Sequence, residues 1–255
     1  MTNIILCGCG GRMGQAIVRA CEASGDLRVV AGVDVNANAV APACAFPVYT
    51  SILEFPERAD VIIDFSHHTA LPSLLDYAVK TGTPLVVATT GHTEEETTAM
   101  KNASEQVAIF FSRNMSIGIN LLIELCKTAA KTLGVAFDVE IIEKHHNQKL
   151  DAPSGTALMI AEAIAEEREE SKFVYDRHAV RKKRESSEIG IHAIRGGTIV
   201  GEHDAIFAGK DEIVTLSHTA TSREVFAEGA LRAASYLAGK GAGLYNMSDL
   251  IREQA

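Results

Sequence analysis

Residues 3–14 read NIILCGCGGRMG, an apolar run followed by a glycine-rich turn. The apolar run at 3–7 predicts a buried strand, and the residues after the turn predict a helix that ends at about residue 23. A second apolar run at 27–33 predicts another strand. A strand, a helix and a strand of these lengths form the βαβ unit with which dinucleotide-binding folds begin.

The turn carries Gly8, Gly11 and Gly14, a variant of the G-x-G-x-x-G motif. Glycine lets the backbone turn tightly and approach a pyrophosphate at the helix N-terminus. Asp34 follows Gly14 at the distance of about 20 residues where an acid can bind the ribose 2′-hydroxyl. A glycine motif alone can be a structural turn, but its combination with the strand, the helix and the acid favours a dinucleotide site.

The same alternation continues to about residue 111. Apolar runs predict strands at 61–65, 84–88 and 107–111, and the stretches between and after them predict helices at 69–80 and 93–103. This order predicts an α/β fold with a Rossmann-like, doubly wound parallel sheet. Ligands of such sheets bind at the carboxyl ends of the strands, so we expect the loops at 66–68, 89–91 and 112–114 to line a cofactor cleft.

Residues 143–157, EKHHNQKLDAPSGTA, hold the densest group of chemically useful side chains in the chain. Ser154 after a proline predicts a helix N-cap, so the first backbone N–H groups, from Gly155 and Thr156, point toward the preceding turn. A helix N-terminus beside a lysine suits a carboxylate or phosphate. The segment therefore predicts an anion site next to an imidazole.

The neighbouring histidines in this segment can also be interpreted as purely structural. Adjacent histidines are more often structural than catalytic, and on a strand His145 and His146 point to opposite faces. Zinc-ligand spacings such as H-E-x-x-H are absent, so we expect no metal. The nearby Lys149 and the anion-binding turn favour a functional role for at least one of the two rings.

The chain after residue 115 has a different character. We predict a helix at 117–133, a strand at 137–143, a helix at 155–169, a loop at 171–187, a hairpin of strands at 188–195 and 198–202 around Gly196-Gly197, a strand at 211–219, a helix at 222–238 and a tail at 241–250. This pattern predicts an α+β domain with a mixed or antiparallel sheet. We expect residues 1–115 and 222–255 to form the dinucleotide-binding domain, and residues 116–221 a substrate-binding and tetramerisation domain.

Composition excludes several classes of partner. The net charge of −9 disfavours nucleic acid and anionic membranes as main partners. The five cysteines are odd in number and show no framework of spacings, which favours a reducing compartment. Because no targeting signal or long apolar run is evident, we expect a cytoplasmic protein.

The segments described so far, with others along the whole chain, resemble one enzyme family. The further segments are Asp64-Phe65, Thr89-Thr90-Gly91, Asn114-x-Ser-x-Gly118, Arg195-x-Gly197, Gly201-Glu-His203 and Ser222-Arg223. Together with residues 143–157, the most specific block, they are similar to the 4-hydroxy-tetrahydrodipicolinate reductases, or dihydrodipicolinate reductases. The resemblance implies a homotetrameric reductase of lysine and diaminopimelate biosynthesis, with NADH or NADPH as hydride donor and a cyclic dicarboxylate as substrate.

The resemblance also implies roles for individual residues. His145 is the expected proton donor, Lys149 binds or polarises the substrate, and His146, Gly155 and Thr156 hold its carboxylate. The candidate cofactor-binding residues are Gly8, Gly11, Arg12, Met13, Gly14, Asp34, Thr89, Thr90, Gly91, Arg113, Asn114 and Met115.

Cofactor preference and two rival functions stay open at this point. Asp34 should repel a 2′-phosphate, which favours NADH, although Arg12 could offset the repulsion and permit dual use. One rival is another Rossmann enzyme that acts on an imine or semialdehyde. The other is a non-catalytic nucleotide sensor, which would not need His145 and Lys149.

Overall fold

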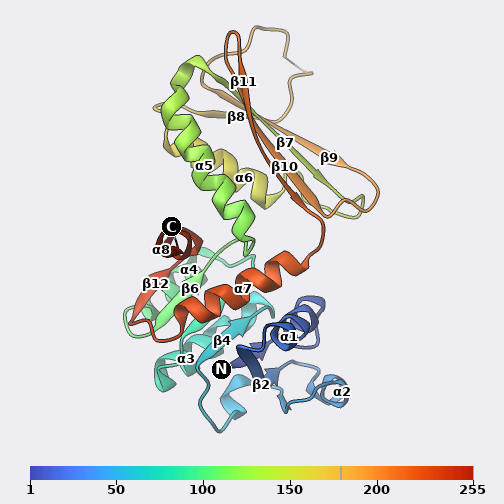
Figure 1. Cartoon of the computed structure of the whole chain (residues 1–255), viewed down its shortest axis with the longest axis vertical. Helices are drawn as coiled ribbons and strands as arrows, with labels where there is room; N and C mark the ends of the chain where they lie inside the picture. Colours follow the sequence, from blue (N-terminus) through green and yellow to red (C-terminus); the bar gives the residue numbers. More distant parts are fainter. Residues whose placement is uncertain (179, 255) are drawn as a thin grey trace. The chain divides into compact units, whose positions relative to one another are not determined.

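The computed structural model describes residues 1–178 and 180–254. Within them the chain forms two compact units, Met1–Ser116 with the part from Glu224 onward, and Ile117–Arg223 (Figure 1). The sequence placed the two crossings near residues 115 and 222. Each unit has its own sheet and its own apolar core.

The first unit is a parallel sheet in the order β12-β6-β5-β4-β1-β2-β3. Its strands are β1 Thr2–Cys7, β2 Leu27–Val33, β3 Val48–Tyr49, β4 Val61–Asp64, β5 Leu85–Val87, β6 Ala108–Phe111 and β12 Gly243–Tyr245. Its helices are α1 Arg12–Ser24, α2 Ala37–Val40, α3 Leu71–Thr81, α4 Glu94–Ala103, α7 Glu224–Leu237 and α8 Met247–Gln254, with 3₁₀ turns η1 Ala41–Ala43, η2 Ile52–Glu54 and η3 His68–Ala70. The predicted Rossmann-like architecture is confirmed.

The apolar runs of this sheet become buried strands because helices cover both faces. Side chains on one face, such as Ile5 and Ile62, share a core with α3 and α4. On the other side of the sheet α7 packs along β4, β5 and β6, and beside α1 (Figure 1). Burial on both faces explains why these strands read as continuous apolar runs and do not alternate.

The second unit is a mixed sheet in the order β11-β10-β7-β9-β8. Its strands are β7 Asp138–His145, β8 Lys172–Val174, β9 Glu188–Arg195, β10 Gly201–Ala208 and β11 Ile213–Ala220, and its helices are α5 Ile117–Leu133 and α6 Gly155–Glu166, with a 3₁₀ turn η4 Gly134–Ala136. α5 and α6 pack on one face of the sheet and share a core with it (Figure 1). The predicted mixed α+β character is confirmed.

The predicted hairpin around Gly196-Gly197 is wrong. β7 lies between β9 and β10, parallel to the first and antiparallel to the second. The glycines make backbone hydrogen bonds to a different segment: Gly196 N–H donates to His145 O at 2.9 Å, and Asn147 N–H donates to Gly197 O at 3.2 Å. The turn therefore supports the chain that leaves β7, and the next strand begins at Gly201, three residues later than predicted.

Two other expectations are corrected. The region 171–187 was predicted as a loop but contains the edge strand β8, which pairs with β9. The predicted tail at 241–250 contains β12 and the first half of α8. β12 extends the parallel sheet beside β6, so the C-terminal segment completes the first unit. No described helix is long and apolar enough to span a membrane.

Candidate functional site

The glycine turn after β1 has the geometry that a dinucleotide loop needs. Gly8 has a φ of +78°, and a Cβ there would lie 2.5 Å from the carbonyl oxygen of Phe65. A Cβ on Gly14 would lie 2.3 Å from the carbonyl oxygen of Gly8. Both positions require glycine because the backbones of β1, β4 and α1 approach one another closely.

The start of α1 is open to an anion. Its N-cap is Gly11, which has no side chain to bind the first N–H groups of the helix. Arg12 is exposed at the first helical position and Met13 is half-buried beside it. The first N–H groups of a helix have no intrahelical acceptor, and together with the helix dipole and a guanidinium they suit a pyrophosphate.

Asp34 lies at the carboxyl end of β2, beside the glycine turn. Its carboxylate accepts the backbone N–H of Gly10 at 3.0 Å and that of Asn36 at 2.9 Å. The side chain is only partly buried, so it remains within reach of a ribose hydroxyl bound over the turn.

The remaining predicted cofactor residues follow β5 and β6 at the same edge of the sheet. Thr89 is buried and donates its hydroxyl to Asp64 at 2.8 Å, whereas Thr90 and Gly91 are exposed. Arg113 is exposed, Asn114 is half-buried and accepts the Ser116 N–H at 2.8 Å, and Met115 is buried. The residues predicted to bind the cofactor thus lie at the carboxyl ends of β1, β2, β5 and β6, where ligands of this fold class bind.

Asp64 is a polar centre at this edge that the sequence-based site omitted. It is fully buried at the end of β4 and accepts the Ser66 N–H at 3.0 Å and the Ser66 hydroxyl at 2.5 Å. Burial raises the pKa of Asp64 above its ordinary value, although the hydrogen bonds from Ser66 and Thr89 oppose the rise. The carboxylate holds together the loops after β4 and β5, which flank the glycine turn.

His68 after β4 and His92 after β5 contact the first turn of α4. His68 Nδ1 lies 2.9 Å from Glu96 Oε1, and Glu96 closes a capping box with Thr93 at the start of α4. His92 is buried beside the same carboxylate, at 3.4 Å. These contacts fix the loop at 66–68 against α4.

The second group of predicted residues lies at the end of β7 and in the turn before α6. Ser154 is the N-cap of α6 and accepts the Ala157 N–H at 3.1 Å, as predicted. Gly155 and Thr156 form the first turn of the helix, and a Cβ on Gly155 would meet no atom within 4 Å. The N-terminal end of a helix carries a positive partial charge, which suits a carboxylate.

His145 is held by polar contacts on the buried side of β7. Its Nδ1 lies 2.6 Å from Glu143 Oε2, and its ring packs edge-on to that of His203, with 5.2 Å between the ring centroids. His203 Nε2 lies 3.1 Å from the Ser154 hydroxyl. Burial, followed by the charge of His145, lowers the pKa of His203 to about 4, so its ring is neutral near pH 7.

His146 and Lys149 belong to the turn that follows. Arg223 Nη2 donates to His146 Nε2 at 3.3 Å, which leaves Nδ1 as the protonated nitrogen of a neutral ring. Partial burial and the positive charge of Arg223 lower the pKa of His146. Lys149 Nζ pairs with Asp151 Oδ1 at 2.9 Å.

Glu143, Arg195 and His203 are the polar residues that the sequence-based site did not include. His203 lies inside β10, where its ring packs beside that of His145. The missed signal was the alternation of β7, because Glu143 and His145 lie two residues apart and therefore share the buried face.

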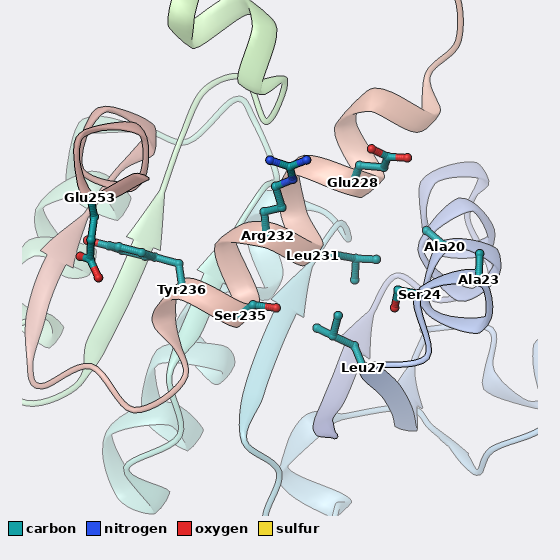
Figure 2. Close-up of a pocket in the computed structure, with 10 residues that line it drawn as sticks. All are labelled: Ala20, Ala23, Ser24, Leu27, Glu228, Leu231, Arg232, Ser235, Tyr236 and Glu253. Atoms are coloured by element: carbon teal, nitrogen blue, oxygen red, sulfur yellow. The ribbon is translucent and has the colours of Figure 1, made fainter. Parts of the chain in front are cut away.

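A cavity elsewhere in the first unit does not coincide with either group of residues. It has a volume of about 650 Å³ and lies between the C-terminal half of α1 and α7 (Figure 2). Ala23 and Ser24 line it, at the opposite end of α1 from the glycine turn. Its lining contains no histidine, and its charged residues are Glu228, Arg232 and Glu253. Among the residues that the structure describes, no cluster of histidine, cysteine or acidic side chains is placed to hold a metal.

The curated relatives compared with this chain share one enzyme name, and solved structures share its fold. Curated relatives named 4-hydroxy-tetrahydrodipicolinate reductase are 52% identical over 254 residues in Caldanaerobacter subterraneus, covering 99% of each chain, and 48% identical over 255 residues in Clostridium novyi, covering 100% of each chain. A solved structure of dipicolinate-bound dihydrodipicolinate reductase from Paenisporosarcina sp. TG-14 has a TM-score of 0.80 and 25% identity, covering 96% of this chain and 97% of that one. A myo-inositol dehydrogenase from Corynebacterium glutamicum, at 16% identity and a TM-score of 0.63, shares the fold.

The family comparison divides the chain near the first boundary between the units, at residue 116. Residues 2–115 match the family described as dihydrodipicolinate reductase, N-terminus, and residues 118–251 match dihydrodipicolinate reductase, C-terminus. Because these matches and the curated relatives cover nearly the whole chain, the chain belongs to the dihydrodipicolinate reductase family.

Proposed function

We propose that this protein is a 4-hydroxy-tetrahydrodipicolinate reductase of lysine and diaminopimelate biosynthesis. The observation that carries the proposal is the group at the end of β7: an imidazole held by a buried carboxylate, a lysine, and a helix N-terminus within one segment. Family membership supports the same reaction, the reduction of a cyclic dicarboxylate by a nicotinamide cofactor.

The glycine turn would bind the cofactor. Gly8, Gly11 and Gly14 let the backbone approach the pyrophosphate, and Arg12 adds a positive charge beside it. The residues after β5 and β6, namely Thr89, Thr90, Gly91, Arg113, Asn114 and Met115, would line the nicotinamide side. When bound, the reduced nicotinamide supplies the hydride.

We propose NADH as the preferred cofactor, with NADPH as a second donor. Asp34 offers a carboxylate to the ribose 2′-hydroxyl of NADH and would repel the 2′-phosphate of NADPH. Arg12 lies at the start of α1 and could partly offset that repulsion.

The substrate would bind before α6. Its carboxylate would accept hydrogen bonds from the first-turn N–H groups of Gly155 and Thr156, and from the Nδ1–H of neutral His146. Lys149, released from Asp151, would add a positive charge near the carboxylates and the developing anion.

His145 would act as the general acid. Addition of a hydride to the conjugated imine leaves an electron pair on the substrate, and the imidazolium gives it a proton. An imidazole suits this step near neutral pH, and general acid catalysis contributes roughly 10²–10⁴-fold to the rate.

We also propose a homotetramer that assembles through the second unit. The face of its sheet opposite α5 and α6 carries apolar side chains among charged ones, including the partly buried Ile142 and Ile206 and the exposed Ile194. Burial of this face against other copies would remove apolar area from water. Light scattering measures the mass directly, and a monomeric mass would contradict this assembly.

The test of the function is oxidation of NADH and of NADPH in the presence of substrate generated from pyruvate and aspartate semialdehyde by the preceding synthase. We expect oxidation that depends on the synthase and is faster with NADH. Oxidation with a different imine or semialdehyde, but not with this substrate, would favour the dehydrogenase alternative. Nucleotide binding without any turnover would favour a sensor.

A further inference from the structure

Glu143 is a charged side chain in a fully buried position. It lies in β7, two residues before His145, and none of its surface is exposed. Its carboxylate accepts four hydrogen bonds: from His145 Nδ1 at 2.6 Å, from Arg195 Nη1 at 2.8 Å and Nη2 at 2.7 Å, and from the Ser154 N–H at 3.0 Å. A buried ion with this many partners indicates a role beyond packing, because an apolar residue would fill the same space without the desolvation cost of a charge.

We propose that Glu143 is a positioning residue for His145: it fixes the Nδ1–H tautomer, so that Nε2 is the nitrogen that delivers the proton to the substrate. This inference rests on the proposed role of His145 as general acid. Glu143 itself does not touch the substrate in this account.

The state of the carboxylate supports the tautomer. Burial alone would raise the pKa of Glu143, but the hydrogen bonds from His145, Arg195 and Ser154 outweigh it and lower the pKa to about 2. An ionised carboxylate can only accept, so His145 Nδ1 must donate. Arg195 matters here because its bidentate contact keeps Glu143 ionised next to the ring.

The other ionisable groups around His145 make this carboxylate important. His203 faces the His145 ring from β10 and is neutral near pH 7. The groups of Arg195 from β9, and of His146 and Lys149 from the turn, are neutral or positive. Lys149 is paired with Asp151. Glu143 is therefore the negative charge in direct contact with the ring, at its Nδ1.

The proton balance of the step is simple. The hydride from the reduced nicotinamide forms a new C–H bond, and the electron pair left on the substrate takes the proton from His145 Nε2. The ring becomes neutral and keeps its Nδ1–H on Glu143. Water then returns a proton to Nε2 before the next turnover.

The test compares two substitutions that separate charge from size. Glu143→Gln keeps the size and loses the charge, whereas Glu143→Asp keeps the charge and is shorter. We expect Glu143→Gln to lower kcat by about 10²-fold, which lies within the range of general acid catalysis. The KM for the substrate should change by less than about threefold, which is on the order of experimental scatter. We also expect the pH above which kcat/KM falls to move downward. Glu143→Asp should recover part of kcat relative to Glu143→Gln.

A matched control is available on the same strand. Glu140 also contacts a histidine and an arginine, with Oε2 2.7 Å from His192 Nε2 and Oε1 3.0 Å from Arg184 Nε, but it points to the opposite face of β7. Glu140→Gln should leave kcat and its pH profile unchanged. If Glu143→Gln does not fold, the double variant Glu143→Gln, Arg195→Gln removes both charges of the pair and should show the same loss of kcat.

Nitrogen-15 NMR of the histidine rings provides a readout that does not depend on turnover. At a pH where the ring is neutral, we expect His145 to carry its proton on Nδ1 in the wild-type protein and to lose this preference in Glu143→Gln. Wild-type kcat with an unchanged pH profile in Glu143→Gln, or an Nε2–H tautomer in the wild type, would overturn the inference. If the wild-type protein does not reduce the substrate, the proposed function fails, while the NMR result still decides the tautomer.

Discussion

The Asp34 carboxylate accepts the backbone N–H of Gly10 at 3.0 Å, which ties the end of β2 to the glycine turn after β1. A Cβ on Gly10 would lie 2.9 Å from the same carboxylate oxygen and 2.5 Å from Val40 Cγ2, so a larger residue would have to displace these side chains. The Asp34 carboxylate, which would bind the ribose, is thus tied to the loop that would bind the phosphates.

Asp34→Ala should therefore change the choice of cofactor. Loss of a hydrogen bond to a charged group corresponds to about 1.5–3 kcal/mol, or roughly 10- to 100-fold in NADH affinity. NADPH should bind equally well or better, since the repulsion of its 2′-phosphate is removed. Calorimetric titration with both cofactors measures the two affinities. Asp26→Ala, at the other end of β2, is the control. Equal losses for both cofactors would mean that Asp34 does not contact the 2′ position.

Gly14→Ala should damage the first unit. The new methyl group would lie 2.3 Å from the carbonyl oxygen of Gly8 and 2.7 Å from Cys9 Cα, both in the backbone, so the turn must shift. Overpacking of this kind costs about 1–3 kcal/mol, equivalent to a fall in Tm of roughly 2–12 °C for a chain of this size. NADH affinity should fall as well. Gly241→Ala, where a Cβ meets no atom within 4 Å, should leave both quantities nearly unchanged.

Lys149→Met should weaken the binding of dicarboxylates. Removal of the ammonium group should raise the Kd for dipicolinate about 10- to 100-fold, the range for a hydrogen bond to a charged group. NADH affinity should not change, because the glycine turn belongs to a separate unit. Lys144→Met is the matched control, since Lys144 lies in β7 and pairs with Glu202 and Asp204. Unchanged dipicolinate binding in Lys149→Met would remove this lysine from the anion site.

Stability should depend on pH through His203. Its pKa is lowered to about 4 in the folded protein, against about 6.5 in the unfolded chain, so the unfolded chain binds more protons between these values. The contribution of His203 is therefore complete above pH ~6.5 and is lost as the pH falls toward about 4, in total about 3 kcal/mol.

Urea unfolding at pH 7.5 and at pH 5.0 measures this dependence. His203→Gln should be less stable at pH 7.5 and should lose less stability on acidification than the wild type. The exposed His178→Gln should behave like the wild type. An identical pH dependence in His203→Gln and the wild type would contradict the buried, neutral state of this ring.

The sequence predicted the parts of the fold that local patterns determine. The strand before Gly8 and the strand at 61–64 are buried on both faces, so their apolar runs were unambiguous. Ser154 was predictable as an N-cap because its role depends on residues next to it in the chain.

Long-range pairing determined what the sequence did not predict. Gly196-Gly197 has the composition of a hairpin turn, yet β7 lies between β9 and β10, and no local signal specifies that order. The strand β12 is three residues long and is held by its pairing with β6. Glu143 and Arg195 are 52 residues apart in the chain, so their contact depends on the parallel pairing of β7 with β9.

Isotope labelling tests directly whether this protein transfers a hydride from NADH to the substrate. The protein is incubated with substrate from the synthase reaction and with NADH that carries deuterium at the transferable position of C4, and the product is analysed by mass spectrometry. We expect one deuterium in the tetrahydrodipicolinate for each NADH oxidised, with little product from His145→Ala. NADH oxidation without deuterium in the product, or no oxidation by a protein that binds NADH, would contradict this expectation.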